Sequence, residues 1–187
     1  MGDKKILTML LGSPRKGGNS ETLADALAAG AAEKGYEVRK VRLAGMTLKG
    51  CLDCRRCWST GTPCVQRDDM DKVYADIEAA DTVALVSPLY FFTWSAQIKP
   101  IFDRLLPFYA KESPRVIKDK KTLLLSVAGD NEAEVFDGLL ATYRLTANYL
   151  GWKNAGEVCA HGIYTRGEME EKGAAWLEAA KELGRGL

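Results

Sequence analysis

Short apolar runs alternate along the chain with stretches whose apolar residues recur at helical spacing. The continuous runs at residues 5–11, 82–86 and 121–127 predict buried strands, because strands of a parallel sheet are covered on both faces. Residues 37–43 alternate between apolar and basic side chains, which predicts a half-exposed strand at the edge of the sheet. Residues 157–160 predict a fifth strand.

The stretches between these runs carry apolar residues at the spacing of a helix that buries one face. Helices are expected at about residues 20–34, 68–80, 95–109, 133–150 and 167–183. Five strands that alternate with five helices predict one α/β domain over residues 1–187, built on a doubly wound parallel sheet. In such a sheet the ligands lie at the carboxyl ends of the strands.

The composition of the chain disfavours some classes of binding partner. The chain has 26 basic and 25 acidic residues, so its net charge of +1 favours neither nucleic acid nor an anionic membrane as a partner. The N-terminus lacks the pattern of a signal peptide, and no apolar stretch approaches the length of a membrane span. Five cysteines, an odd number, favour thiol, metal or redox chemistry over a disulfide scaffold. We therefore expect a cytoplasmic protein.

The loop between the first strand and the first helix, residues 12–20, has the sequence Gly-Ser-Pro-Arg-Lys-Gly-Gly-Asn-Ser. Main-chain N–H groups at a helix start attract an anion, and Ser13, Asn19 and Ser20 can donate to phosphate oxygens. Arg15 can add a charge-assisted hydrogen bond. The loop matches neither the nucleotide P-loop nor the dinucleotide fingerprint. The alternative is a polar turn in which Ser20 merely caps the helix.

Four aromatic residues follow the central strand: Tyr90, Phe91, Phe92 and Trp94. An α/β sheet opens a ligand crevice at this position, and such a cluster suits a flat conjugated ring. Alternatively, Phe92 and Trp94 pack against the following helix or form a subunit interface.

A long irregular segment at about residues 44–67 carries the cysteines Cys51, Cys54, Cys57 and Cys64. Four soft ligands within fourteen residues suit an iron–sulfur cluster or zinc. Free or redox-active thiols are the third alternative, and nearby basic side chains would offset the charge of thiolates.

These motifs resemble those of the NADPH-dependent FMN reductase and iron-sulfur flavoprotein branch of the flavodoxin-like proteins. Residues 12–20 look like the family's FMN-phosphate loop, G-S-P-R-x-x-G-N-S. Three further segments look like the family's second flavin loop and the helix after it: S-P-L-Y at residues 87–90, S-A-Q-I-K at 95–99 and D-R at 103–104. Residues 64–70 resemble the C-V-x-x-D-D-M signature that follows the cysteine motif of the iron-sulfur flavoproteins.

The resemblance implies a flavodoxin-like sheet with strand order 2-1-3-4-5 and bound FMN. It assigns the phosphate to Ser13, Arg15, Asn19 and Ser20. It assigns the isoalloxazine ring to Pro88, Leu89, Tyr90 and Phe91, with Gly129 and Asp130 near the other edge of the ring. For Gly129 and Asp130 an ordinary turn is the alternative. The four clustered cysteines would hold a 4Fe-4S cluster, zinc or nothing.

The function implied is an oxidoreductase in which NAD(P)H reduces FMN by a ping-pong mechanism, with the cofactor carrying the chemistry. The acceptor would be a quinone, a nitro- or azo-aromatic, a metal ion or a protein. The alternative is an iron-sulfur flavoprotein that carries electrons between proteins. A binding module without flavin is disfavoured by the intact phosphate loop. We also expect a homodimer or homotetramer, because the aromatics around Phe92 and Trp94 would otherwise form an exposed apolar patch.

Overall fold

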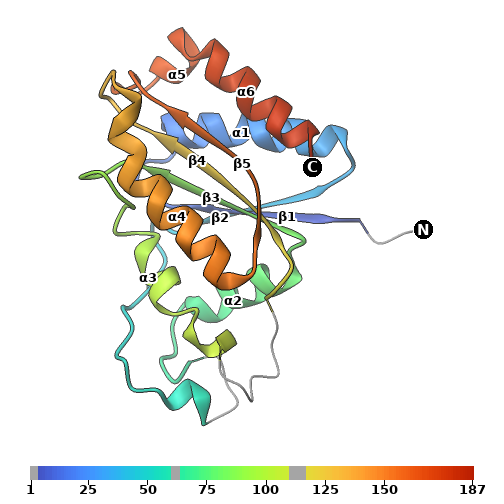
Figure 1. Cartoon of the computed structure of the whole chain (residues 1–187), viewed down its shortest axis with the longest axis vertical. Helices are drawn as coiled ribbons and strands as arrows, with labels where there is room; N and C mark the ends of the chain where they lie inside the picture. The colour runs from blue at the N-terminus through green and yellow to red at the C-terminus, as the bar shows by residue number, and fades with distance from the viewer. Residues whose placement is uncertain (1–3, 60–63, 110–116) are drawn as a thin grey trace.

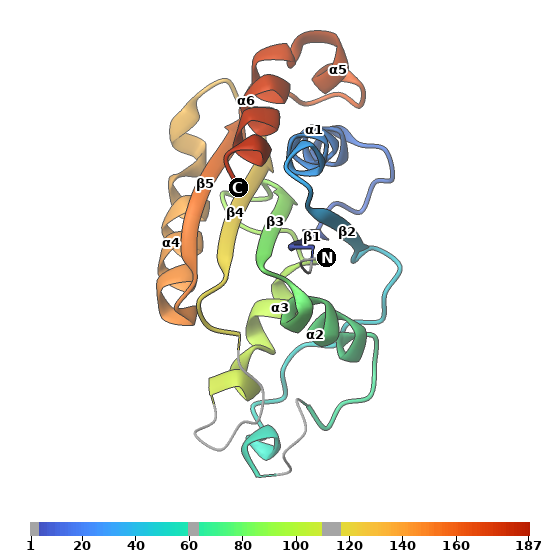
Figure 2. The ribbon, with the colours of Figure 1, turned by 90° about the vertical axis from the view of Figure 1, so that its right-hand side faces the viewer.

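The computed structural model describes residues 4–59, 64–109 and 117–187 of the chain. Within them, five parallel strands form one sheet in the order β2-β1-β3-β4-β5, which confirms the predicted architecture and strand order. Figure 2 shows the strands in this order across the molecule. The strands are β1 (Ile6–Leu11), β2 (Glu37–Arg42), β3 (Thr82–Pro88), β4 (Lys121–Val127) and β5 (Lys153–Ala160).

Helices cover both faces of the sheet (Figures 1 and 2). One face carries α1 (Asn19–Glu33), α5 (Glu168–Lys172) and α6 (Ala174–Arg185), and the other carries α2 (Met70–Ala79), α3 (Lys99–Asp103) and α4 (Asp137–Leu150). Short 3-10 turns occur at η1 (Arg56–Trp58), η2 (Leu106–Tyr109) and η3 (Ala133–Phe136). Among the described residues, no helix is both long and apolar enough to cross a membrane.

The sheet separates two hydrophobic cores. Successive side chains of a strand point to opposite faces, so Met9 packs with Leu27 of α1 while Leu10 packs with Ile77 of α2. All four of these side chains are fully buried. Burial on both faces explains why β1 appears in the sequence as an unbroken apolar run.

Helices α1 and α6 approach closely enough to require glycine at their contact. A Cβ on Gly30 would lie 2.0 Å from the Lys181 carbonyl oxygen, and one on Gly184 would lie 2.3 Å from the Leu27 carbonyl oxygen. This contact fixes α6, and with it the preceding α5, beside the start of α1. It therefore helps to position the loop that precedes α1.

The helix expected at residues 95–109 is wrong in length. The segment contains only the five-residue α3 and, after a break, η2. The Ser95 side chain donates to the Gly12 carbonyl oxygen at 2.6 Å and so holds its backbone against the loop after β1. Pro100 lies in the first turn of α3, and Pro107 lacks the N–H that a continuous helix would need.

Two other boundaries also differ from the expectation. Strand β5 begins at Lys153 rather than 157, with an irregular register against β4 and a φ of +145° at Gly156. This half of β5 consists mostly of polar residues and a glycine, so no apolar run marks it in the sequence. The expected final helix is two helices, because the chain breaks at Gly173, where a Cβ would lie 2.5 Å from the Met169 carbonyl oxygen.

Candidate cofactor site and cysteine cavity

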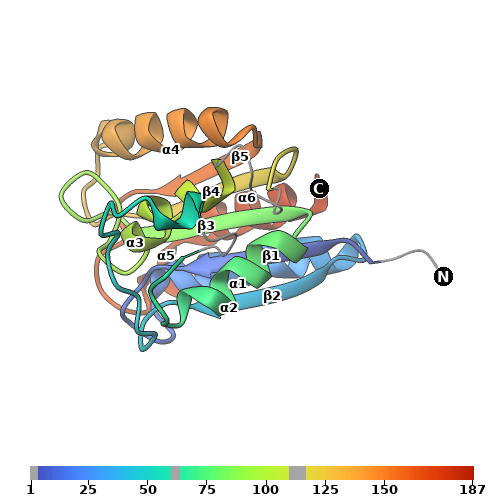
Figure 3. The same cartoon turned by 90° about the horizontal axis from the view of Figure 1, so that it is seen from below.

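A cavity of about 200 Å³ lies where the loops after β1, β3, β4 and β5 meet. These loops gather at the end of the sheet opposite the N-terminus (Figure 3). The cavity brings together most of the predicted cofactor ligands: Ser13, Arg15, Asn19, Ser20, Pro88, Leu89, Tyr90 and Gly129. Predicted ligands from three separate loops thus line one site, which we call the cofactor cavity.

The start of α1 offers hydrogen-bond donors to this cavity. The N–H groups of Glu21 and Thr22 donate to the Gly18 carbonyl oxygen at 2.8 and 3.1 Å. The two preceding N–H groups, of Asn19 and Ser20, have no acceptor within the described residues, as expected for the first turn of a helix. A helix start with free N–H groups is a favourable place for an anion.

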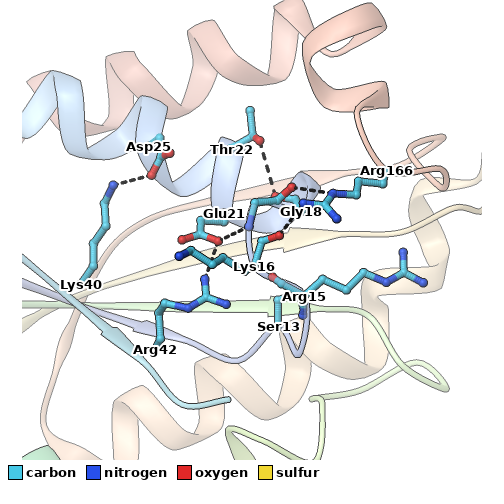
Figure 4. A network of polar contacts seen from close by, with 11 residues as sticks. Ser13, Arg15, Lys16, Gly18, Glu21, Thr22, Asp25, Lys40, Arg42 and Arg166 are labelled. Atoms are coloured by element: carbon cyan, nitrogen blue, oxygen red, sulfur yellow. Dashed lines mark hydrogen bonds and ion pairs between the residues drawn. The ribbon is translucent and has the colours of Figure 1, made fainter. Parts of the chain in front are cut away.

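A carboxylate behind the loop holds its shape. The Glu21 Oε2 atom accepts hydrogen bonds from the Gly17 N–H at 2.6 Å and from Arg42 of β2 at 2.5 Å (Figure 4). Partial burial acts to raise the pKa of Glu21, but these two hydrogen bonds and the charge of Arg42 outweigh it and lower the pKa. In the same view, the Arg15 guanidinium points away from this network and takes no part in it. Arg15 is therefore available to a ligand.

The four clustered cysteines line a second, smaller cavity of about 20 Å³, which we call the cysteine cavity. Its other walls come from α2 and from the segment that joins α3 to η2, and it shares no lining residue with the cofactor cavity. Burial, together with the neighbouring cysteines, raises the pKa of Cys57. Within the described residues, which include all four sulfurs, no group of three or more His, Cys, Asp or Glu side chains is arranged to hold a metal ion.

The base of the cysteine loop is closed by two aspartates that follow it. Asp69 accepts from the Thr47 N–H at 2.9 Å, and Asp68 accepts from the Lys49 N–H at 3.0 Å. Asp68 also forms an ion pair with Arg104 at 2.5 Å, and both side chains are only 1% exposed. These contacts give a structural reason for the two consecutive aspartates in the signature at residues 64–70.

Burial acts to raise the pKa of Asp68, but the hydrogen bonds from Arg104, Lys49 and Met70 lower it overall. Burial likewise acts to lower the pKa of Arg104, and the hydrogen bond to Asp68 raises it overall. Both groups are therefore charged at neutral pH. Two of the basic side chains near the cysteines form ion pairs with aspartates: Arg55 pairs with Asp53 at 2.7 Å and Arg67 pairs with Asp71 at 3.6 Å.

Comparison with known proteins assigns the chain to a family. The family model described as NADPH-dependent FMN reductase matches residues 5–150. The chain belongs to the NADPH-dependent FMN reductase family.

Two relatives of the chain are named iron-sulfur flavoprotein. The one from Archaeoglobus fulgidus is 41% identical over 99 residues, which cover 53% of this chain and 44% of the relative. The one from Methanosarcina thermophila is 35% identical over 123 residues, which cover 66% of this chain and 63% of the relative. The chain thus spans about half the length of the relatives it matches.

Solved structures show the same fold. An NAD(P)H:quinone oxidoreductase from Methanothermobacter marburgensis superposes with a TM-score of 0.77 at 18% identity, covering 98% of this chain and 96% of that one. An azoreductase from Bacillus anthracis superposes with a TM-score of 0.73 at 20% identity, covering 99% of this chain and 100% of that one. At these identities the likeness establishes the fold and no more.

Asn19 has a second role in this FMN reductase family member. Its side-chain amide donates to the Thr165 carbonyl oxygen at 2.8 Å, and its oxygen accepts from the N–H groups of Gly167 and Met169 at 3.1 and 3.3 Å. All these partners belong to the chain around the start of α5. Asn19 lines the cofactor cavity, as expected, but its side chain ties the phosphate loop to α5.

The loop after β5 supplies cavity residues that the sequence analysis missed. Ile163 and Tyr164 line the cofactor cavity, and a Cβ on Gly129 would lie 2.4 Å from the Tyr164 ring. Arg166 donates to the carbonyl oxygens of Lys16 and Gly17 and holds this loop against the phosphate loop (Figure 4). These residues could have been predicted from their position after the carboxyl end of the fifth strand, because ligands bind at such ends of a parallel sheet.

The aromatic cluster divides into an exposed turn and a buried anchor. Tyr90 and Thr93 exchange main-chain hydrogen bonds at 3.0 and 3.1 Å across a turn whose two central residues, Phe91 and Phe92, have φ values of +45° and +64°. Phe91 is 95% exposed and Phe92 63% exposed, and neither lines the cofactor cavity. Trp94 is buried and packs in the core, as the packing alternative expected. Only Tyr90 of this cluster reaches the cofactor cavity.

Asp130 builds a turn beside the cofactor cavity without lining it. Its carboxylate accepts from the Glu132 N–H at 3.0 Å, and its carbonyl oxygen accepts from the Gly162 N–H at 2.5 Å. Cys159 lies on β5, outside both cavities, and burial raises the pKa of its thiol to about 12, with the charge of Glu157 adding to the effect. This thiol is therefore unreactive, as expected for a small apolar residue of a strand.

Proposed function

We propose that this chain is an FMN-dependent oxidoreductase that takes electrons from NAD(P)H and passes them to a quinone, a nitro- or azo-aromatic, a metal ion or a protein. The observation that carries the proposal is the cofactor cavity, in which the free N–H groups of a helix start face an apolar wall. The names of the family and of the quinone and azo reductases that share the fold support it.

The cofactor cavity fits the two chemically different ends of FMN. The N–H groups of Asn19 and Ser20, together with the Arg15 guanidinium, suit the phosphate, because charge-assisted hydrogen bonds to a dianion are strong. Leu89 and Tyr90 offer apolar surface to a flat ring. When bound, FMN supplies hydride and electron transfer, and the protein orients it and shields it from water.

Anaerobic mixing tests this proposal. The purified chain is loaded with FMN and mixed with NADPH or NADH in a stopped-flow spectrometer, and the visible flavin absorbance is followed. A reductase bleaches rapidly, and a quinone added afterwards restores the flavin bands. Absence of rapid bleaching with either nucleotide would overturn the reductase assignment and leave an electron carrier.

We propose an iron-sulfur flavoprotein that carries electrons between proteins as the second candidate function. The observation that favours it is the cysteine cavity, where four sulfurs and a buried arginine share one small space. Soft sulfur donors suit iron, and the relatives named iron-sulfur flavoprotein support the proposal. Iron and sulfide analysis after anaerobic reconstitution decides it, since fewer than about two irons per chain contradicts a four-iron cluster.

We further propose that the protein forms a homodimer or homotetramer in which a second copy covers the turn at Phe91 and Phe92. Two large aromatic side chains exposed on one turn are costly to leave in water. Sedimentation velocity at micromolar concentration is expected to show an oligomer that dissociates in the Phe91→Ser/Phe92→Ser variant. A monomer in the unmodified protein contradicts the proposal.

A further inference from the structure

Arg104 is the largest fully buried side chain of the described residues, and only one of its guanidinium nitrogens has hydrogen-bond partners there. Its Nη1 atom donates to Asp68 Oδ2 at 2.5 Å and to the Lys49 carbonyl oxygen at 3.2 Å. These two bonds fix one end of the guanidinium at the base of the cysteine loop. The position of the other edge, formed by Nε and Nη2, is thereby fixed as well, because the guanidinium is planar and rigid.

The Nε and Nη2 atoms of Arg104 are buried and have no hydrogen-bond partner within the described residues. A buried donor without an acceptor is destabilising, and more so when the group is charged, so native proteins seldom leave one. Two such atoms on one edge of an arginine form a fork that matches a doubly accepting anionic group. The free edge therefore points to an acceptor that is not one of the described polar atoms.

The surroundings of Arg104 are rich in sulfur. Arg104 lines the cysteine cavity together with all four clustered cysteines. The neighbouring Tyr74 hydroxyl donates to the Arg104 carbonyl oxygen at 2.7 Å. Asp68 already accepts from the N–H groups of Lys49 and Met70 as well as from Arg104. Asp103, which also lines the cavity, accepts from the Lys99 ammonium at 2.6 Å. Sulfide held by the four cysteines would bring further anionic acceptors into this cavity.

We propose that the Nε and Nη2 edge of Arg104 donates N–H···S hydrogen bonds to an iron–sulfur cluster held by Cys51, Cys54, Cys57 and Cys64. This inference rests on the second candidate function and does not depend on the FMN reductase activity. The buried, unpartnered edge is also the observation that fits such a cluster to the cavity, because the sulfurs of a cluster are anionic hydrogen-bond acceptors. Arg104 is then a tuning residue for the cluster and no ligand of it.

Two consequences follow from this placement. Hydrogen bonds to sulfur stabilise the more negative, reduced form of a cluster, so Arg104 raises its reduction potential. The ion pair with Asp68 keeps the arginine in place, and through Lys49 the pair also closes the loop that carries the cysteines. One buried pair thus couples the potential of the cluster to the closure of its loop.

The test uses the full chain, reconstituted anaerobically with ferrous iron and sulfide, in the unmodified form and as Arg104→Lys. Lysine retains a positive charge for Asp68 but cannot present a two-atom edge to sulfur. The matched control is Arg67→Lys, an exposed arginine near the same loop that pairs with Asp71. Iron content and the midpoint potential, from a dithionite titration followed by electron paramagnetic resonance, are measured in all three proteins.

Iron content is expected to be retained in Arg104→Lys, while the equilibrium constant for one-electron reduction falls about tenfold, or about 59 mV. The control is expected to keep the unmodified potential. If Arg104→Lys does not fold, the double variant Arg104→Gln/Asp68→Asn, which contains no buried charge, is measured instead and is expected to show the same fall.

An unchanged potential in a folded Arg104 variant overturns the inference, and so does an unmodified protein that binds fewer than about two irons per chain. Neither outcome affects the reductase proposal. The same preparations are loaded with FMN and mixed with NADPH, so a failure of flavin bleaching is recorded separately from a failure at the cluster.

Discussion

The cofactor cavity and the cysteine cavity hold their polar groups in different ways. The phosphate loop presents main-chain N–H groups that are aligned by the start of α1 and braced locally by Glu21. The cysteine cavity depends instead on Arg104, whose partner Asp68 lies 36 residues away in the sequence. A site built from main-chain groups forms with its helix, whereas a site built on a buried ion pair forms only when distant segments pack. Within the described residues, one edge of Arg104 is still without an acceptor.

The largest expected effect comes from breaking the buried pair. Asp68→Asn leaves the charge of Arg104 buried without a counter-charge, and we expect it to lower the free energy of unfolding by about 3–5 kcal/mol. Urea unfolding followed by circular dichroism measures this loss. The control Asp71→Asn removes an exposed ion pair and is expected to cost less than about 1 kcal/mol. Equal losses in the two variants would show that the buried Asp68–Arg104 pair contributes no more to stability than an exposed ion pair.

The next effect concerns binding at the cofactor cavity. Arg15→Ala combined with Ser20→Ala removes two donors to a phosphate dianion, and we expect FMN affinity to fall by about 3 kcal/mol, or more than a hundredfold. Fluorescence titration of FMN measures the change. Arg39→Ala, which removes a half-buried arginine of β2 paired with Glu37, is the control and is expected to bind FMN normally. Unchanged affinity in the double variant would refute the phosphate assignment.

A smaller effect tests how α5 is held against the phosphate loop. Asn19→Ala removes one donated and two accepted hydrogen bonds, and we expect the free energy of unfolding to fall by about 1–2 kcal/mol. Asn148→Ala, on the exposed side of α4, serves as the control and should change stability by less than about 0.5 kcal/mol. If both variants are equally stable, the contacts of Asn19 with α5 do not contribute.

The smallest expected effect is on how the free energy of unfolding changes with pH. Because its contacts lower the pKa of Asp68 in the folded protein, Asp68 stabilises the fold fully above its unfolded pKa of about 3.9. That contribution is lost as the pH falls through the lowered folded value. We therefore expect stability to fall more steeply on acidification below about pH 4 in the unmodified protein than in Asp68→Asn. Parallel unfolding curves of the two proteins against pH would contradict this.

Much of the cofactor site could be predicted because its signals are local. The apolar run of β1, the following glycine-rich loop and the helical spacing after it place Ser13, Arg15 and Ser20 at the carboxyl end of a strand. The alternation of strands and helices likewise predicts the doubly wound sheet, and resemblance to the family supplied the strand order. The close spacing of the four cysteines in the sequence also predicted that they lie on one loop.

Only the tertiary structure decided which residues complete the two cavities. Tyr164 reaches the cofactor cavity because contacts between α1 and α6, and between Arg166 and the phosphate loop, bring the loop after β5 into place. Phe91 belongs to the predicted ring site by sequence, yet the turn that contains it points the side chain into solvent. Arg104 follows a short helix with no sequence pattern that marks it as buried.

The physical reason is the range of the interactions. Hydrophobic periodicity, helix starts and turn residues act over a few positions, so the sequence by itself determined the elements, their order and the phosphate loop. Burial of a charge and the partner that makes it tolerable depend on packing between segments far apart in the chain. The pairing of Arg104 with Asp68, and with it the buried edge that has no acceptor among the described residues, exists only in the folded protein.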